Sequence, residues 1–323
     1  MMVAHIFRAA VVICLSVASL FAAKNETRKL LTADSSKGRI AIIDESGDTT
    51  WEYKIGPLHD LHVLDNGHIL FQTNWTHIVE VDPETNQVVW EYESKDSPGN
   101  ADRRVEVHAF QRLANGNTMI VESGATRILE VDPDGKIVKQ IPLRVKKPHP
   151  HKDTRLVRKL DNGHYLVCHE ADGLVREYGP EGQTLWQYKV PMFGKEPKGG
   201  HGVEAFGNAC FSALRLDNGN TLIATGNGHS VIEVTPDKKI VWKLTQNELP
   251  DIQLAWVTTL EVLPSGNIVI GNCHAGEKNP QIIEITRDKE VVWTFHDFNR
   301  FGNATTNTQI LSVNGKPIGE TIR

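Results

Sequence analysis

The 323-residue sequence has few cysteines, no excess of basic residues and only one long apolar run, and each shortage excludes a class of protein. Its 35 Lys and Arg residues are outnumbered by 40 Asp and Glu residues, which gives a formal net charge of −5, and no basic block stands out. This balance argues against nucleic acid as a partner. No apolar run after residue 23 is long enough to cross a bilayer, so we expect no membrane span.

The one apolar run lies at the N-terminus. Residues 1–23 read MMVAHIFRAAVVICLSVASLFAA, in which an Arg precedes an apolar stretch of secretory length that ends in small residues. The pattern predicts a signal peptide that is removed. We therefore expect residues 24–323 to form a single domain in an extracytoplasmic location, either periplasmic or secreted.

The chain has four cysteines. One of the four lies in the predicted signal peptide, and Cys168, Cys210 and Cys273 remain. An odd number in an oxidising compartment leaves at least one thiol unpaired within the chain, and the spacing leaves the disulfide pairing open.

A repeat dominates the rest of the chain. The segments LDNGHILF, LANGNTMI, LDNGHYLV, LDNGNTLI and LPSGNIVI begin at Leu64, Leu113, Leu160, Leu216 and Leu263, and a looser copy begins at Leu311. Each turn signal stands between two strand-like stretches, and two further strands follow. A repeat of 40–50 residues with short strands is typical of a β-propeller blade. The fourth strands carry Trp51, Trp90, Trp186, Trp242 and Trp293, with Lys139 in the remaining blade, and these tryptophans are predicted to pack between blades.

Strands from the two ends of the chain are predicted to form one blade together. Residues 30–55 hold three strands of a blade without its first strand, and residues 306–313 supply a first strand with little after it. Joined, they give a sixth blade and leave no open sheet edge. The sequence therefore predicts an all-β, six-bladed propeller with four-stranded antiparallel blades.

Three blade turns, VDPDGKIVK, YGPEGQTLW and IDESGDTTW, resemble the Asp-x-x-Gly-Lys-x-x-Trp signature of the quinoprotein-like propellers, whose repeat is named after pyrroloquinoline quinone. The resemblance covers residues 30–320 and implies the propeller fold. Family members that use the quinone usually have more blades, and many carry a disulfide between adjacent cysteines. This chain has no adjacent cysteines, so its cofactor stays unknown.

Antiparallel strands bring the start of each first strand and the end of each second strand to one face of the disc. The residue five places before the repeat leucine is His59, His108 and Arg155 in three consecutive blades. With His169, at the end of a neighbouring strand, these form the candidate catalytic quartet. The candidate ligand-binding residues of the same face are Asp60, His62, Asn74, Glu122, His151, Glu170, His201, Asn227, Asn272 and His274.

Several functions fit this face. The first is a site for a small-molecule or glycan ligand, in particular one with an anionic group. The second is an enzyme. The segments HPHKDTRLVRKLDNGHYLV and LHDLHVLDNGHILF are similar to segments of bacterial arylsulfotransferases, which move sulfate between phenols through a sulfated histidine. A lyase or hydrolase would use the same residue types. The third is a protein-interaction or metal-binding propeller, with Cys168-His169, Cys210 and Cys273-His274 as candidate ligands. The sequence leaves the substrate and the oligomeric state open.

Overall fold

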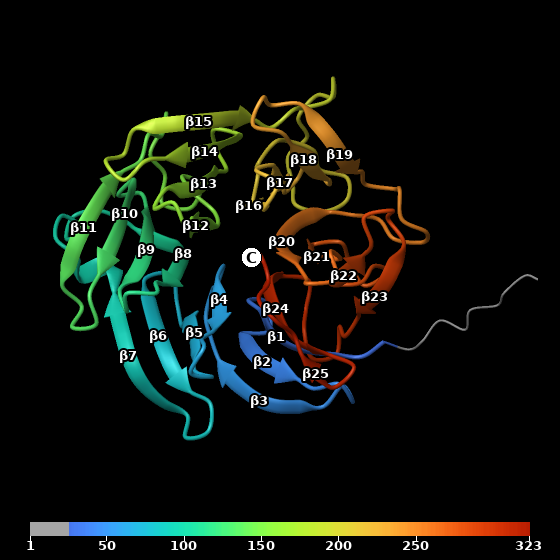
Figure 1. The fold of residues 1–323 in the computed structure, drawn as a ribbon, viewed down its shortest axis with the longest axis horizontal. Helices are drawn as coiled ribbons and strands as arrows, with labels where there is room; N and C mark the ends of the chain where they lie inside the picture. Colours follow the sequence, from blue (N-terminus) through green and yellow to red (C-terminus); the bar gives the residue numbers. More distant parts are fainter. Residues whose placement is uncertain (1–25) are drawn as a thin grey trace, which may run out of the picture.

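The computed structural model describes residues 26–323, which form six antiparallel sheets around a central axis (Figure 1). The predicted signal peptide, residues 1–23, lies outside the described residues. Within residues 26–323 the only helical element is a single 3-10 turn, η1 (Ser94–Asp96), and no helix there could cross a membrane. The predicted all-β, six-bladed architecture is confirmed.

Each blade is one sheet, and the blades are numbered in chain order. Blade 1 holds β1 (Arg28–Asp34), β2 (Arg39–Ile43), β3 (Thr49–Lys54), β24 (Thr305–Val313) and the short β25 (Lys316–Pro317). Blade 2 holds β4 (Leu61–Val63), β5 (Ile69–Gln72), β6 (His77–Asp82) and β7 (Gln87–Glu93). Blade 3 holds β8 (Glu106–Arg112), β9 (Thr118–Ser123), β10 (Arg127–Val131) and β11 (Ile137–Pro142).

The second half of the ring repeats this plan. Blade 4 holds β12 (Val157–Lys159), β13 (Tyr165–His169), β14 (Leu174–Tyr178) and β15 (Thr184–Lys189). Blade 5 holds β16 (Ser212–Arg215), β17 (Thr221–Ala224), β18 (Val231–Val234) and β19 (Ile240–Leu244). Blade 6 holds β20 (Trp256–Val262), β21 (Ile268–Cys273), β22 (Ile282–Ile285) and β23 (Val291–Phe295).

The core lies between blades. Middle strands such as β5 are buried at every position because both faces of the sheet are covered, whereas the outer strand β15 alternates between exposed and less exposed positions. Leu31 and Ile40 of blade 1 belong to the same apolar cluster as Phe71 and Val79 of blade 2. Most of the hydrophobic stabilisation therefore comes from blade-to-blade contact.

The tryptophans of the fourth strands join neighbouring blades, as predicted. The indole N–H of Trp90 donates to the carbonyl of Pro133 at 3.1 Å, and that of Trp186 donates to the carbonyl of Pro236 at 2.9 Å. Each acceptor lies in a turn of the next blade, so the indole both packs and donates across the boundary.

The ring closes with strands from both ends of the sequence. β24 pairs with β1 in antiparallel register, with Leu30 opposite Ile310 and Thr32 opposite Thr308. The predicted closing strand, residues 306–313, differs from β24 by one residue at its start. Beyond β25 the chain turns inward, and its last residue lies at the centre of the ring in Figure 1.

Candidate functional site

The backbone departs from regular strand geometry at the same repeat position in all six blades. His108 and Thr258 lie at β-bulges in β8 and β20, and Thr306 lies at a bulge in β24. In the other three blades the equivalent residues, His59, Arg155 and Phe211, stand before the first residue of β4, β12 and β16. Bulges re-aim side chains, and this repeated irregularity turns one residue per blade toward the channel mouth opposite the LDNG turns.

The structure brings three of the four quartet residues together at this mouth. The ring centroids of His59 and His108 are 4.6 Å apart, and Nη1 of Arg155 lies 3.0 Å from Nδ1 of His108. Phe211, the equivalent residue of blade 5, lies 5.6 Å from the His59 ring and under the Arg155 guanidinium. All four side chains are buried. We call this group, with Glu106, His151, Glu170 and Trp75, the histidine mouth.

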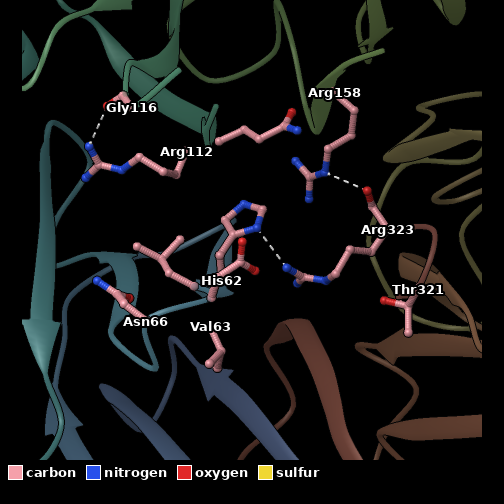
Figure 2. Close-up of a pocket in the computed structure, with 11 residues that line it drawn as sticks. His62, Val63, Asn66, Arg112, Gly116, Arg158, Thr321 and Arg323 are labelled. Atoms are coloured by element: carbon pink, nitrogen blue, oxygen red, sulfur yellow. Dashed lines mark hydrogen bonds between the residues drawn. The ribbon is translucent and has the colours of Figure 1, made fainter. Parts of the chain in front are cut away.

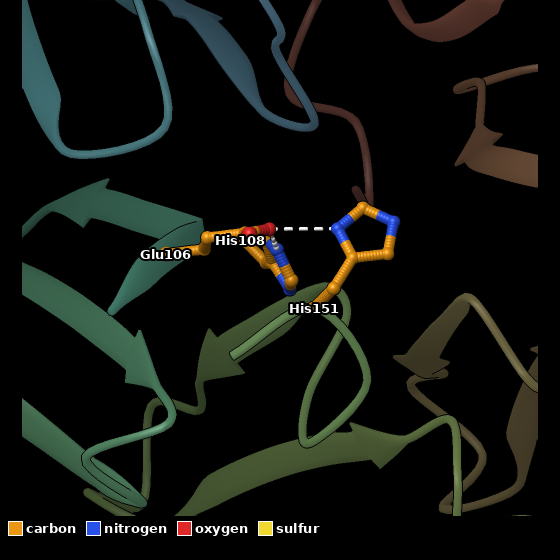
Figure 3. Close-up of side chains that lie close together, drawn as sticks. All are labelled: Glu106, His108 and His151. Atoms are coloured by element: carbon orange, nitrogen blue, oxygen red, sulfur yellow. Dashed lines mark hydrogen bonds and ion pairs between the residues drawn. The ribbon is translucent and has the colours of Figure 1, made fainter. Parts of the chain in front are cut away.

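Glu106 links two of the histidines (Figure 3). Its Oε2 lies 3.2 Å from Nε2 of His108 and 2.7 Å from Nδ1 of His151. Its other oxygen accepts a hydrogen bond from Arg104 at 2.6 Å. Burial acts to raise the pKa of Glu106, but the hydrogen bonds from both histidines outweigh it and hold the pKa well below its ordinary value. Glu106 is therefore a carboxylate at neutral pH.

The two buried imidazoles are neutral. Burial lowers the pKa of His108 to about 4, with the charge of Arg155 acting in the same direction. Burial also lowers the pKa of His59 well below its ordinary value, and His108, Arg155 and His151 add to this effect. A neutral imidazole can accept a proton or bind an electrophile.

Arg155 is not a free cation. Its Nη2 forms an ion pair with the buried carboxylate of Glu170. Burial raises the pKa of Glu170, and the charge of Arg155 opposes this. The ion pair uses Oε2 of Glu170 and Nη2 of Arg155, whereas Nε of Arg155 is buried without a hydrogen-bond partner. The ion pair neutralises the charges of Arg155 and Glu170, and the Nε–H of Arg155 is still free to donate a hydrogen bond.

A second group of rings extends the mouth toward blade 6. His201, in the loop 191–207, lies 4.7 Å from the ring of Trp256 and 5.0 Å from that of His274. Trp256 and Phe211 belong to one apolar cluster, so the rings around His201 and the histidine mouth rest on the same buried apolar side chains. The longest loop between blades thus packs on the face that carries the histidine mouth.

The other predicted residues of this face make internal contacts. His169 is buried: its Nδ1 donates to the Asp153 carbonyl at 3.0 Å and its Nε2 accepts from the Tyr178 hydroxyl at 2.9 Å. No hydrogen bond or ring contact within residues 26–323 joins it to Arg155. The side chains of four further candidates hydrogen bond neighbouring strands and loops, namely Asn74, Glu122, Asn227 and Asn272.

Asp60 and His62 lie deeper in the channel. Asp60 accepts from Arg158 at 2.8 and 3.0 Å, and His62 donates to the carbonyl of Phe110 at 2.8 Å. Burial lowers the pKa of His62 to about 4. Arg323, the last residue of the sequence, donates to Nδ1 of His62 at 2.8 Å. These contacts fill the channel between its two mouths.

An open hollow lies at the opposite, turn face (Figure 2). It measures about 560 Å³ and is lined by turn residues such as Asn66 together with Arg112, Arg158 and Arg323. Arg112 is already paired with Glu80, and Arg158 with Asp60. Arg323 forms no ion pair within residues 26–323, and its Nε is buried without a hydrogen-bond partner. We place the candidate site at the histidine mouth because imidazoles, a guanidinium and carboxylates lie in direct contact there.

The three cysteines are buried free thiols, and Cys273 lies apart from the other two. Cys168 and Cys210 lie in one apolar cluster, and Cys273 lies in another with Trp256. The predicted set of cysteine and histidine metal ligands is therefore not assembled. No two of the cysteines are adjacent in sequence, so a disulfide between neighbouring cysteines, of the kind that many quinone-binding propellers carry, does not fit this chain.

The candidate site residues chosen from the sequence do not include Glu106 and Trp75, although the sequence places Glu106 at the same strand start as His108 and offers Trp75 as an aromatic for a ligand. Glu106 stands two residues before His108, and period-two alternation along a strand was a usable signal for a shared face. Trp75 follows the end of β5, and its ring lies 5.0 Å from that of His59 and 5.2 Å from that of His151. Nothing in its repeat position distinguished it.

Comparison with known proteins bears on the fold and the family. The sequence profile of the PQQ_2 family, described as outer membrane protein assembly factor BamB, matches residues 36–295. The chain belongs to this family. The BamB-type profile thus spans all of blades 2 to 6 and part of blade 1, in agreement with the resemblance seen in the blade turns. No curated protein matches the chain.

Several solved structures are similar to this chain in fold. A protein of unknown function from Bacteroides caccae is 26% identical, with 91% of this chain and 100% of that chain covered and a TM-score of 0.71. A streptogramin B lyase is 14% identical, with 84% and 80% covered and a TM-score of 0.57. A catalytically inactive virginiamycin B lyase from Staphylococcus aureus with quinupristin is 12% identical, with 85% and 86% covered and a TM-score of 0.55. The likeness to the two lyases shows the fold alone.

Proposed function

We propose that the histidine mouth binds a small molecule through an anionic group, and that this binding is the function of the propeller. The supporting observation is a pair of unsatisfied polar atoms: Nδ1 of His59 and Nε of Arg155 are both buried and lack hydrogen-bond partners. Buried polar groups are almost always paired in folded proteins, so two such atoms in one cluster indicate a partner from outside the chain.

The two unpaired atoms suit an oxyanion. Nε of Arg155 can donate to a carboxylate, sulfate or phosphate oxygen, and Nδ1 of His59 can exchange a hydrogen bond with the same group. Trp75 and Phe211 supply flat apolar surface for the rest of the molecule. We further propose an extracytoplasmic location, which rests on the signal-peptide pattern of residues 1–23.

Thermal stabilisation by sulfate and by phosphate, measured against chloride at equal ionic strength, tests this proposal. Arg155→Ala should abolish the stabilisation while the fold survives. The double variant Arg155→Ala/Glu170→Ala removes both charges and avoids a buried unpaired carboxylate. The matched control is Arg176→Ala, which loses a buried arginine paired with Asp172 away from the mouth. Unchanged stabilisation in both Arg155 variants would show that the anion binds elsewhere.

A second candidate function is group transfer or hydrolysis by a histidine, as in an arylsulfotransferase-like enzyme. Glu106 holds Nδ1 of His151 at 2.7 Å, and the His151 side chain is 38% exposed, so the other ring nitrogen can meet a substrate. A carboxylate that orients an imidazole is a common arrangement in acid–base and nucleophilic catalysis. His108 is buried and contacts Glu106 and Thr154, so His151 and His59 are better placed to attack.

Release of 4-nitrophenol from 4-nitrophenyl sulfate separates the two candidates. With a second phenol or water to accept the sulfate, an enzyme should release 4-nitrophenol, and His151→Ala and His59→Ala should lower that rate by about 10²–10⁴-fold. A binding protein should be stabilised by the same compound without releasing phenol.

A further inference from the structure

Three donors at the histidine mouth are arranged as metal ligands are. One nitrogen each from His108 and His151 and one oxygen of Glu106 lie within 4.8 Å of one another. In a tetrahedral zinc site the ligand atoms stand about 2.0–2.1 Å from the ion and so roughly 3.3 Å apart. The two contacts of Glu106, 3.2 and 2.7 Å, are close to this spacing, and the two imidazole nitrogens, which lie within 4.8 Å of one another, would have to approach on binding.

The contacts of His108 allow either tautomer of its ring. Nδ1 lies 2.7 Å from the carbonyl of Thr154, which accepts, and 3.0 Å from Nη1 of Arg155, which donates. With the proton on Nε2, the ring donates to Glu106. A cation bound at Nε2 would take the place of that proton, which could move to Nδ1 and be donated to the carbonyl of Thr154. An imidazole that donates its other N–H to a backbone carbonyl is the usual arrangement of a metal-binding histidine.

The carboxylate is oriented in the same way. Arg104 donates to Oε1 of Glu106 at 2.6 Å, which leaves Oε2 for the ion. His151 needs only to move its proton from Nδ1 to Nε2, so no proton has to leave that ring. Ligating side chains and their supporting groups are therefore both present.

We propose that Glu106, His108 and His151 form a site for a first-row divalent cation such as Zn²⁺, with at least one coordination position open toward the mouth. Two histidines and one carboxylate are a common ligand set for catalytic zinc and for non-haem Fe²⁺. His59 lies against both imidazoles, at 4.6 and 5.8 Å between ring centroids, and its unpaired Nδ1 can bind a molecule held by the ion.

The cation would also provide the charge that the mouth lacks. Arg104 and Arg155 balance Glu106 and Glu170, so the four charged side chains sum to zero. A divalent ion makes the centre positive and gives an oxyanion a ligand position beside Arg155. This role in anion binding rests on the proposed function, whereas binding of the metal itself does not.

Titration of chelator-treated protein with Zn²⁺ by calorimetry, and with Co²⁺ by absorbance, tests the site. We expect one equivalent per chain, a Co²⁺ ligand-field band, and quenching of Trp75, whose ring lies 5.2 Å from that of His151. Glu106→Gln and His151→Ala should weaken binding by at least the ~10–100-fold that loss of a supporting partner already costs.

The matched control is His164→Ala. Nδ1 of His164 lies 2.6 Å from Glu177, so it forms a histidine–glutamate pair at the turn face. This variant should bind Zn²⁺ as the unsubstituted protein does. The site is refuted if the unsubstituted protein binds Zn²⁺ no more tightly than His151→Ala, or if His164→Ala loses as much affinity.

Sulfate stabilisation with and without Zn²⁺ separates this inference from the proposed function. Equal stabilisation in both states leaves the anion site standing and refutes the role of the metal in it. Zn²⁺ binding with no sulfate stabilisation in either state leaves the metal site standing and refutes the proposed function. Stabilisation that appears only with Zn²⁺ supports both.

Discussion

Asp60 is the main buried acceptor of the channel. Its carboxylate is fully buried and receives two hydrogen bonds from Arg158, one from Asn307 and one from the backbone N–H of Phe110. These donors come from blades 4, 1 and 3, so one side chain of blade 2 joins three other blades across the axis. Burial acts to raise the pKa of Asp60, but Arg158 and His62 outweigh it and hold the pKa well below its ordinary value.

Asp60→Asn should destabilise the fold by about 3–5 kcal/mol at neutral pH, because it leaves Arg158 buried without a counter-charge. A carboxyl whose pKa is lower in the folded state stabilises the protein above its unfolded-state pKa, about 3.9 for Asp. That stabilisation is lost as the pH falls toward the folded-state pKa. The difference in unfolding free energy between the two proteins should therefore be constant from pH 5 to 7 and shrink below about pH 4.

Urea unfolding at several pH values measures this difference. Asp161→Asn, at an exposed turn residue, is the control and should change stability by no more than about 0.5 kcal/mol. A cost for Asp60→Asn that stays constant into the acid range would show that the charge of Asp60 is not what stabilises the channel.

At this scale the sequence was partly informative about the site. The repeat position alone predicted that His59, His108 and Arg155 share one mouth, because equivalent residues of neighbouring blades are related by the rotation of the ring. It also selected His169, which the structure shows satisfied by Asp153 and Tyr178. The position of a residue in the repeat predicts on which face of the propeller it lies. The direction of its side chain depends on its rotamer and its hydrogen-bond partners, which the repeat pattern does not specify.

The bulges and turns are the elements that give each blade two different ends. The LDNG turns could be predicted because Asn-Gly and Asp-Asn chemistry is local, and the predicted glycines do have positive φ, for example 81° at Gly163. The bulges at His108, Thr258 and Thr306 could not be predicted, since each depends on pairing with the next strand. The direction of the site residues follows from these bulges.

Gly163→Val tests the turn as an element of the scaffold. No atom lies within 4 Å of a Cβ added at Gly163, so the cost comes from the backbone alone. A left-handed conformation costs an L-residue roughly 1–2 kcal/mol, and a β-branched side chain suffers most. Chemical denaturation should show a loss of this size, and the sulfate affinity of the folded protein should not change because the turn faces away from the histidine mouth.

Gly199→Val is the control for this change. Gly199 also has no atom within 4 Å of an added Cβ, and its φ is not in the left-handed region, so stability should hold. Loss of anion affinity in Gly163→Val at unchanged stability would mean that the turn face binds the ligand.

The ring as a whole follows from the period of the repeat and from its two incomplete ends. Strands, turns and blade number were predictable from the sequence because each blade encodes its own pattern. The contents of the channel were not, since Asp60, Arg158 and Asn307 meet only when three blades close around the axis. The two mouths also differ: Arg112 and Arg158 at the turn face are paired with carboxylates, whereas the opposite face brings several histidines into contact with one another.

Removal of the closing strand tests the ring directly. β24 pairs with β1 from Arg28 to Asp34, and Asn307 also donates to Asp60 across the channel. Deletion of residues 304–323 would expose the edge of β1 and uncover the apolar cluster that contains Ile310, so the protein should aggregate or fail to fold. The control is deletion of residues 314–323, which removes β25 and the contacts of Arg323 but keeps β24. That shorter protein should fold with a lower melting temperature, and light scattering with thermal unfolding distinguishes the two. An unchanged melting temperature after the longer deletion would mean that β24 does not close the ring.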